Sequence, residues 1–109
     1  MAGTILDLTD QTWEKEVMAS PQAVLVDFWA NWCVPCKTML PSIEAVARQF
    51  DGRLKVVKLN VEENAQVPFR YNITTLPTLL VIKGGVVAEQ RVGLVSKDNL
   101  VKLLEPHLG

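Results

Sequence analysis

Residues 23–37, AVLVDFWANWCVPCK, contain both cysteines of this 109-residue chain and decide how its central part folds. The stretch 23–29 is a nearly continuous apolar run, which is the pattern of a strand buried on both faces. After the cysteines, residues recur at helical spacing along one face, namely Cys36, Leu40, Ile43, Ala47 and Phe50. The order strand, Cys-x-x-Cys, helix is typical of a redox motif in an α/β protein.

The spacing of Cys33 and Cys36 favours reversible disulfide chemistry over structural cross-linking. A disulfide that stabilises a fold gains most from closing a long loop, and a ring this small constrains little. The alternative is half of a zinc site, which needs four ligands, and the only further candidate is His107, far away in the sequence. A zinc site shared between two chains stays open as an alternative, and redox exchange is the favoured interpretation.

Charge and composition exclude several classes of function. The 11 basic and 12 acidic residues are interspersed and give a net charge of −1, which argues against binding to nucleic acid or to a membrane surface. Residues 1–7 lack the charged and apolar regions of a secretory signal, and no apolar run approaches the ~18 residues of a membrane span. We therefore expect one domain over residues 1–109, acting as a monomer in the cytoplasm, or in the stroma or matrix of an organelle if a transit peptide was removed.

Hydrophobic periodicity along the chain predicts strands that alternate with helices. Strands are expected at 4–8, 23–30, 54–61, 77–83 and 86–92, with a turn at 83–85 joining the last two. Helices are expected at 10–19, with Trp13 and Val17 on the inner face, at 33–50 and 64–71, and after Ser96 as N-cap, where Leu100, Leu103, Leu104 and His107 repeat at helical spacing. This pattern predicts an α/β sandwich, but periodicity does not give the order of the strands.

The motif Asp27-Phe28-Trp29-Ala30-x-Trp32-Cys33-x-Pro35-Cys36-Lys37 closely resembles the active-site signature of the thioredoxin family. The resemblance continues through residues 58–61, Tyr71, residues 76–79, Gly84 and Gly93, and so covers essentially the whole chain. It implies an α/β thioredoxin fold, with a five-stranded mixed sheet of order 1-3-2-4-5 flanked by four helices.

The same resemblance implies a general protein disulfide reductase and electron carrier. Such a protein uses its own Cys33–Cys36 dithiol and disulfide, with no other cofactor and no metal. Its partners are proteins that contain disulfides, and a flavin- or ferredoxin-linked thioredoxin reductase that restores the dithiol. Two rivals stay open: an oxidant or isomerase, although these often carry a histidine between the cysteines, and a binding protein that does not cycle its thiols.

The two cysteines are expected to have different roles. A helix N-terminus presents unpaired N–H groups and about half a positive charge, which stabilises a thiolate placed there. Cys33 lies at that end, so we expect it to be the exposed nucleophile of low pKa. Cys36 lies one turn inward on the core-facing side, and we expect it to be the shielded, resolving thiol.

Asp27 is an acid in the middle of an apolar strand, where carboxylates are rarely found without a purpose. Burial would raise its pKa and allow it to exchange a proton with Cys36. Thioredoxins carry an aspartate at this place, accompanied by a lysine that matches Lys58. The alternative is an acid at a strand end that is satisfied by backbone groups.

Pro77 opens the fourth predicted strand, and the matching proline of thioredoxins is cis and faces the cysteine pair. Trp32 directly precedes the nucleophile, and the resemblance places it in an apolar docking surface for partners together with Val34, Pro35, Leu76, Gly93 and Leu94. The chain departs from the family at Val34, which is usually glycine, and at 74–75, where two threonines replace a charged and a small residue. Both departures lie on the docking surface, so they concern the range of partners rather than the chemistry.

Overall fold

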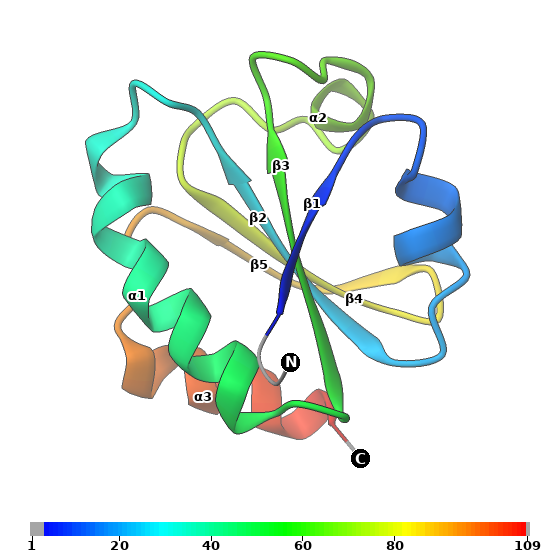
Figure 1. Cartoon of the computed structure of the whole chain (residues 1–109), viewed down its shortest axis with the longest axis vertical. Helices are drawn as coiled ribbons and strands as arrows, with labels where there is room; N and C mark the ends of the chain where they lie inside the picture. Colours follow the sequence, from blue (N-terminus) through cyan, green and yellow to red (C-terminus); the bar gives the residue numbers. More distant parts are fainter. Residues whose placement is uncertain (1–3, 109) are drawn as a thin grey trace.

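The protein is built around one twisted sheet of five strands, seen in a computed structural model that describes residues 4–108 (Figure 1). The strands are β1 Ile5–Leu8, β2 Ala23–Trp29, β3 Leu54–Asn60, β4 Thr78–Lys83 and β5 Val86–Val92. Their order is β1-β3-β2-β4-β5, with β1 and β2 parallel to β3, and with β4 antiparallel to both β2 and β5. The mixed sheet and its strand order are those that the resemblance implied.

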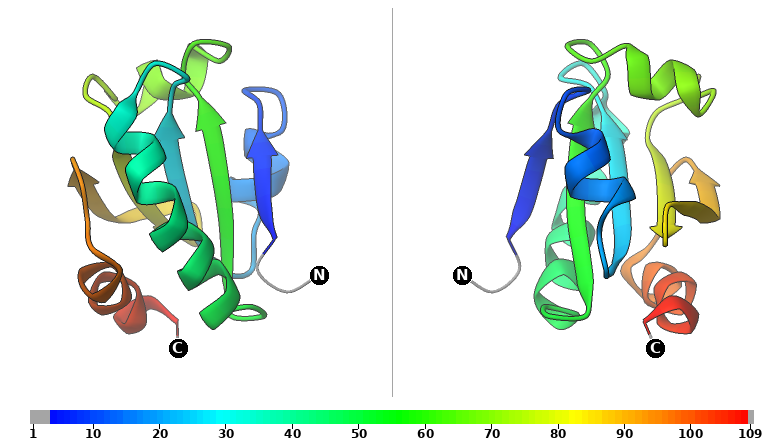
Figure 2. Two further views of the ribbon diagram at one scale, coloured as in Figure 1. Left: turned by 60° about the vertical axis from the view of Figure 1, so that its left-hand side comes forward. Right: turned by 90° about the vertical axis from the view of Figure 1, so that its right-hand side faces the viewer.

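Helices cover both faces of the sheet (Figure 2). On one face lie α1 Val34–Gln49 and α3 Lys97–Leu104, and a single 3-10 turn, η2 Glu105–His107, continues α3. On the other face lie the π-helical segment η1 Glu14–Met18 and the short α2 Gln66–Arg70. Among residues 4–108, no helix has the length and apolar character that crossing a bilayer requires.

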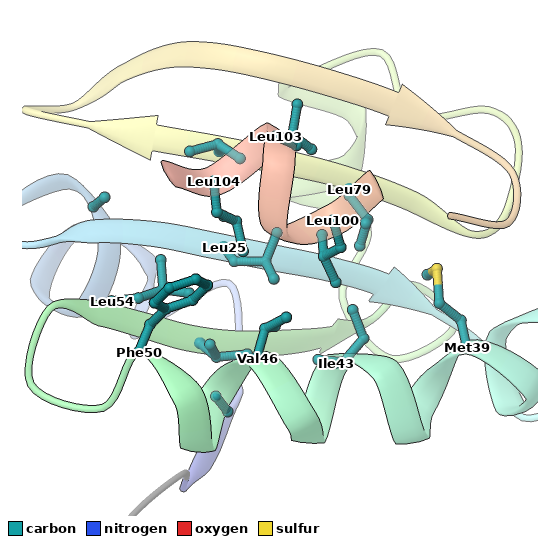
Figure 3. Close-up of a cluster of buried hydrophobic side chains, with 14 residues drawn as sticks. Leu25, Met39, Ile43, Val46, Phe50, Leu54, Leu79, Leu100, Leu103 and Leu104 are labelled. Atoms are coloured by element: carbon teal, nitrogen blue, oxygen red, sulfur yellow. The ribbon is translucent and has the colours of Figure 1, made fainter. Parts of the chain in front are cut away.

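The apolar run of β2 is explained by burial on both faces. Ala23 and Leu25 face the core beneath α1 and α3, whereas Val24, Val26 and Phe28 face the core beneath η1 and α2. Figure 3 shows the first of these cores, in which α1, α3 and the strands interdigitate through Leu25, Met39, Ile43, Val46, Phe50, Leu54, Leu79, Leu100, Leu103 and Leu104. The predicted inner face of α1 is confirmed except at Leu40, which is half-buried and lines a small cavity instead.

The predicted helix at 10–19 is only partly correct. Trp13 and Val17 are buried as expected, and the Trp13 ring contacts those of Phe28 and Tyr71, with centroids 6.4 and 5.4 Å away. Helical structure over this range is short and begins at Glu14, because the carboxylate of Asp10 does not act as the N-cap of this segment. It accepts the N–H groups of residues 66 and 67 at 3.0 and 2.9 Å and thereby caps α2.

The helical spacing of Leu100, Leu103, Leu104 and His107 predicted one helix through His107, but α3 ends at Leu104. Pro106 has no N–H to continue an α-helix, and the chain tightens into η2 after Leu104. The His107 ring is half-buried, and its Nε2 lies 3.0 Å from Oε2 of Glu89 on β5.

Ser96 is the N-cap of α3, as its position in the sequence predicted, and its Oγ accepts the N–H of Asn99 at 3.2 Å. We expect Ser96→Ala to lower the free energy of unfolding by about 1 kcal/mol, because the helix loses the acceptor for one of its unpaired N–H groups. Ser96→Asp is the matched control, since it keeps an acceptor and places a negative charge at the helix N-terminus. Urea denaturation of the three proteins measures the effect, and an equal loss in both variants would show that the cap contributes nothing.

Candidate active site

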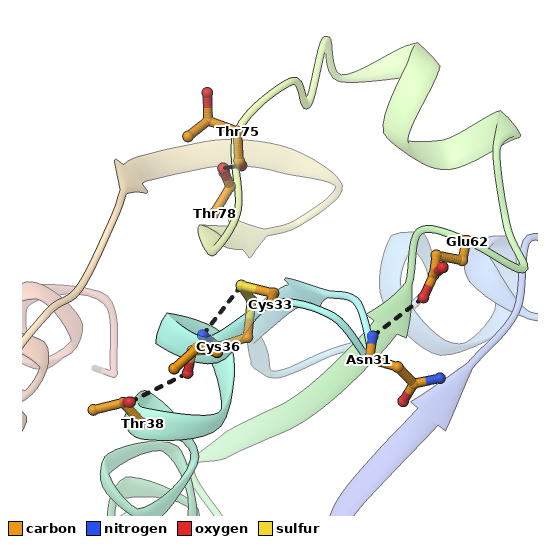
Figure 4. The surroundings of a disulfide bond; sticks show 8 residues. Asn31, Cys33, Cys36, Thr38, Glu62, Thr75 and Thr78 are labelled. Atoms are coloured by element: carbon orange, nitrogen blue, oxygen red, sulfur yellow. Dashed lines mark hydrogen bonds between the residues drawn. A yellow bond between two sulfur atoms is a disulfide. The ribbon is translucent and has the colours of Figure 1, made fainter.

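The cysteine pair lies where β2 ends and α1 begins, and Cys33 is the N-cap residue of α1. Its Sγ accepts the backbone N–H of Cys36 at 3.2 Å, and the two sulfur atoms are joined in a disulfide (Figure 4). Pro35 lies in the first turn, where its missing N–H leaves no hydrogen bond unmade. A negative charge on the Cys33 sulfur would therefore be stabilised by one N–H bond and by the positive end of the helix dipole.

The expectation that Cys33 is exposed is wrong for this disulfide-bonded form. Cys33 and Cys36 are only 3% and 4% exposed, so burial does not distinguish them. The reason is that the disulfide packs with Ala30 and is flanked by half-buried apolar side chains from three separate segments, namely Trp29, Val61 and Leu76. What distinguishes the two thiols is the capping position of Cys33 and the place of Cys36 inside the first turn.

Asp27 lies beneath the helix that carries the cysteines. It is buried, and its Oδ1 has no hydrogen-bond partner among residues 4–108, which rules out an Oδ1 satisfied by backbone groups. Together with Cys36 it lines a cavity of about 70 Å³, whose other walls are Trp29, Lys37, Leu40 and Lys58. The structure thus brings together Asp27, Cys36 and Lys58 around one cavity.

Two opposing effects act on the Asp27 carboxyl group. Burial raises its pKa from the ordinary 3.8 to about 7, and the positive charge of Lys58 lowers it by a smaller amount. Lys58 is directly opposite Asp27 in the parallel register of β2 and β3. Its Nζ lies 5.1 Å from the centroid of the Trp29 ring and 3.7 Å from Oδ1 of Asp7, so the ammonium group is held at the edge of the cavity.

The segment before β4 faces the cysteine pair. The Leu76–Pro77 peptide bond is cis, as the resemblance implied, and Pro77 is buried just before β4 begins. The carbonyl of Pro77 accepts the N–H of Gly93 at 2.8 Å, which ties this segment to the end of β5. Figure 4 shows Thr75 and Thr78, on either side of Pro77 in the chain, across from the disulfide.

An apolar surface surrounds the disulfide, and we call it the docking patch. Trp32, Val34 and Leu94 are 66%, 69% and 61% exposed, so they are available to a partner rather than part of a core. Pro35 is exposed as well, whereas Leu76 and Gly93 are half-buried at the margin. All six residues expected on this surface are at least partly accessible, and they come from three separate segments of the chain.

Sequence reasoning missed several residues that shape the site. Trp29 is half-buried and lines the cavity beside Lys58. Oε1 of Glu62 accepts the N–H of Asn31 at 3.2 Å and so holds the loop that leads to Trp32. Leu40 was expected on the same helix face as Cys36, which it follows by four residues, and its place in the wall of the cavity could have been inferred from this spacing. Nothing local in the sequence marks Glu62.

Within residues 4–108, no group of three or more His, Cys, Asp or Glu side chains is arranged to hold a metal ion. The two sulfur atoms that a zinc ion would use are bonded to each other. The chemistry that this arrangement supports is the making and breaking of that bond.

Comparison with known proteins gives a consistent result. The sequence model of the family described as Thioredoxin matches residues 4–106. The chain is 43% identical over 108 residues to "Thioredoxin" of Chlorobaculum thiosulfatiphilum, which covers 99% of this chain and 100% of that protein. It is 46% identical over 101 residues to "Thioredoxin 1" of a Nostoc species, and this match covers 93% of this chain and 94% of that protein. It is 41% identical over 108 residues to "Thioredoxin" of Pseudomonas aeruginosa, and this match covers 99% of this chain and 100% of that protein.

The burial of Asp27 predicts a specific pH dependence of stability. Because its pKa rises from 3.8 to about 7 on folding, the ionised form disfavours the folded state. The neutral Asp27 carboxyl group makes its full contribution to the free energy of unfolding below pH 4, and this contribution is lost as the pH rises through 7. Asp27→Asn removes this titration, so the stability of the variant relative to the wild type should increase between pH 4 and pH 8 by an amount on the order of 4 kcal/mol.

Urea unfolding of the oxidised proteins at several pH values measures this difference. Asp98→Asn, which makes the same change of charge on the exposed first turn of α3, is the matched control. A difference between Asp27→Asn and wild type that does not vary with pH would contradict the assignment of a buried, proton-binding acid.

Proposed function

The chain belongs to the thioredoxin family of thiol–disulfide oxidoreductases, and we propose that it is a general protein disulfide reductase, built as one domain over residues 1–109, in which Cys33 is the nucleophile and Cys36 the resolving thiol. The observation that carries this assignment is the N-cap position of Cys33, whose sulfur accepts the N–H of Cys36. About half a positive charge at the helix N-terminus favours the thiolate form, which is the reactive form in disulfide exchange.

The reaction proceeds in two exchanges. The Cys33 thiolate attacks one sulfur of a target disulfide, and the other target sulfur leaves as a thiolate that takes up a proton. Cys36 then gives up its proton to a base and attacks Sγ of Cys33, and the second target sulfur leaves as a thiolate that takes up a proton. The target has gained two electrons and two protons, and this protein is left with the Cys33–Cys36 disulfide present in the structure.

Asp27 is the proposed proton acceptor for Cys36, and Lys58 is proposed to adjust the pKa of Asp27 through its positive charge. The support is that both residues line one cavity with Cys36, and that the pKa of Asp27 is about 7, near the value at which a group can both take and return a proton. The cavity of about 70 Å³ has room for water, whose share of the liquid volume is about 30 Å³, so a water molecule can bridge carboxylate and thiol.

The docking patch is the proposed contact surface for target proteins and for the reductase. Exposed apolar patches mark partner sites, and this one surrounds the reactive disulfide. We propose that a target lies in extended form against the backbone before Pro77. Val34 and the pair Thr74 and Thr75 then set which targets fit, because they replace the residues usual at these positions.

The electron-carrier role requires a supply of electrons. A thioredoxin reductase returns the dithiol, and assays with a flavin-linked and with a ferredoxin-linked enzyme distinguish the two types. We place the protein, acting as a monomer, in the cytoplasm, because a reductase needs a compartment that keeps thiols reduced.

The assignment of the two thiols is tested by trapping. Wild type should reduce insulin with dithiothreitol as electron donor, and Cys33→Ser should not, whereas a protein that only binds would show no dependence on its cysteines. Cys36→Ser should form long-lived mixed disulfides with insulin chains, visible by non-reducing electrophoresis and mass spectrometry, because the resolving thiol is absent. Equal trapping by Cys33→Ser and Cys36→Ser would contradict the assignment.

Val34→Gly tests whether this position affects partners or the redox chemistry. Helix propensity differs between valine and glycine by only some tenths of a kcal/mol, and 30 mV corresponds to about 1.4 kcal/mol, so the reduction potential should shift by less than about 20 mV. Reduction of the small disulfide DTNB should stay within about threefold. A lost or gained contact at an interface amounts to about 1–3 kcal/mol, so rates with protein partners should change more, by up to about a hundredfold, and unequally. The same factor for every substrate would show that Val34 tunes the thiols themselves.

A further inference from the structure

A groove adjoins the docking patch and has no part in the chemistry described above. It runs between β5 and α3 and encloses about 500 Å³. On the β5 side its walls include Arg91, Val92 and Leu94, and on the α3 side they include Asn99, Lys102 and Pro106. Leu94 belongs to both surfaces, so a chain docked at the disulfide can continue into the groove without leaving the protein surface.

The charges in the groove are unequal. The carboxylate of Glu89 is already engaged, with His107 Nε2 at 3.0 Å and Arg91 at 3.4 Å, and these contacts lower its pKa. Lys102 is exposed and has no ion-pair partner among residues 4–108. Lys102 also lines a neighbouring hollow on α3 together with Asp98 and Glu105, and neither carboxylate forms an ion pair with it. The lining of the groove itself, with Arg91 and Lys102 against the carboxylate of Glu89, therefore carries an excess of one positive charge beside apolar walls.

We propose that this groove binds an acidic and apolar segment of the target protein, next to the disulfide that is reduced. The inference rests on the proposed function, because it assigns a class of targets to the same site. Residues 99–106 of α3 and η2 span about 10 Å at the helical rise of 1.5 Å per residue, which three or four extended residues of a target would match. One carboxylate in that segment would lie near Lys102, and its apolar residues would pack against Leu94, Leu103 and Pro106.

Peptide substrates test this proposal directly. A neutral core peptide with one disulfide is compared with versions extended by four residues, either alternating Glu and Leu or alternating Gln and Leu, at either end. The measured quantity is the ratio of kcat/KM for an extended peptide to that for the core peptide, which cancels differences in the amount of active protein. The Glu-Leu extension at one end should raise this ratio about three- to tenfold above the Gln-Leu extension in low salt, and less in 0.5 M salt.

Two charge-reversal variants on α3 distinguish binding in the groove from the effect of the net charge of the protein. Lys102→Glu should remove the advantage of the acidic extension. Lys97→Glu makes the same change of net charge on α3 but does not line the groove, so it should keep the advantage within about twofold. Equal losses in both variants, or equal ratios for the Glu-Leu and Gln-Leu peptides, would overturn the proposal.

Two further outcomes are informative. Sedimentation that shows wild type self-associating, and Lys102→Glu remaining monomeric, would mean that a second copy fills the groove and would overturn the proposal. If the core peptide itself is not reduced in a manner that depends on Cys33, the proposed function fails and this inference fails with it. A core peptide that is reduced normally, without any gain from the acidic extension, overturns only the assignment of the groove.

Discussion

Burial of β2 on both faces and along both edges is the constraint on which the rest of the structure depends. The strand pairs with β3 on one side and β4 on the other, and helices cover it above and below. The side chains of residues 23 to 28 are all buried, so a carboxylate placed there loses its contact with bulk water. The same strand ends directly before the N-terminus of α1, so the position that buries Asp27 also places Cys33 at a helix end.

The site then holds two ionisable groups in environments that act in opposite directions. At Cys33 the N–H groups of α1 favour a negative charge on sulfur, whereas at Asp27 the loss of water disfavours a negative charge on oxygen. Lys58 could have reversed the second effect. Its ammonium group is held over the Trp29 ring and near Asp7, at the cavity edge, so its charge reduces the effect of burial without cancelling it. Opposed environments of this kind allow one group to be a nucleophile while its neighbour carries a proton.

Much of this arrangement was predictable, because its signals are local. The apolar run of β2, the helical spacing after Cys36 and the cap at Ser96 each occupy a few consecutive residues. The strand order and the cis bond at Pro77 came only from the family resemblance, since no periodicity contains them. The predictions that failed depend on contacts between distant residues: Asp10 caps α2 some 56 positions away, and the cover over Cys33 is supplied in part by Val61 and Leu76.

Chemistry and target choice come from different parts of the chain, with one exception. β2, β3 and the first turn of α1 hold the thiols and the acid, whereas the segment before Pro77, the end of β5 and α3 present the surfaces that we propose for partners. Thr74 and Thr75 are exposed, and it is Leu76 rather than either threonine that packs against the disulfide, so these two residues are compatible with an intact site. Val34 belongs to both groups, because it is the first residue of α1 and is also 69% exposed beside the disulfide. Its backbone N–H contributes to the helix N-terminus whatever its side chain is, so the exposed side chain can vary without removing that contribution.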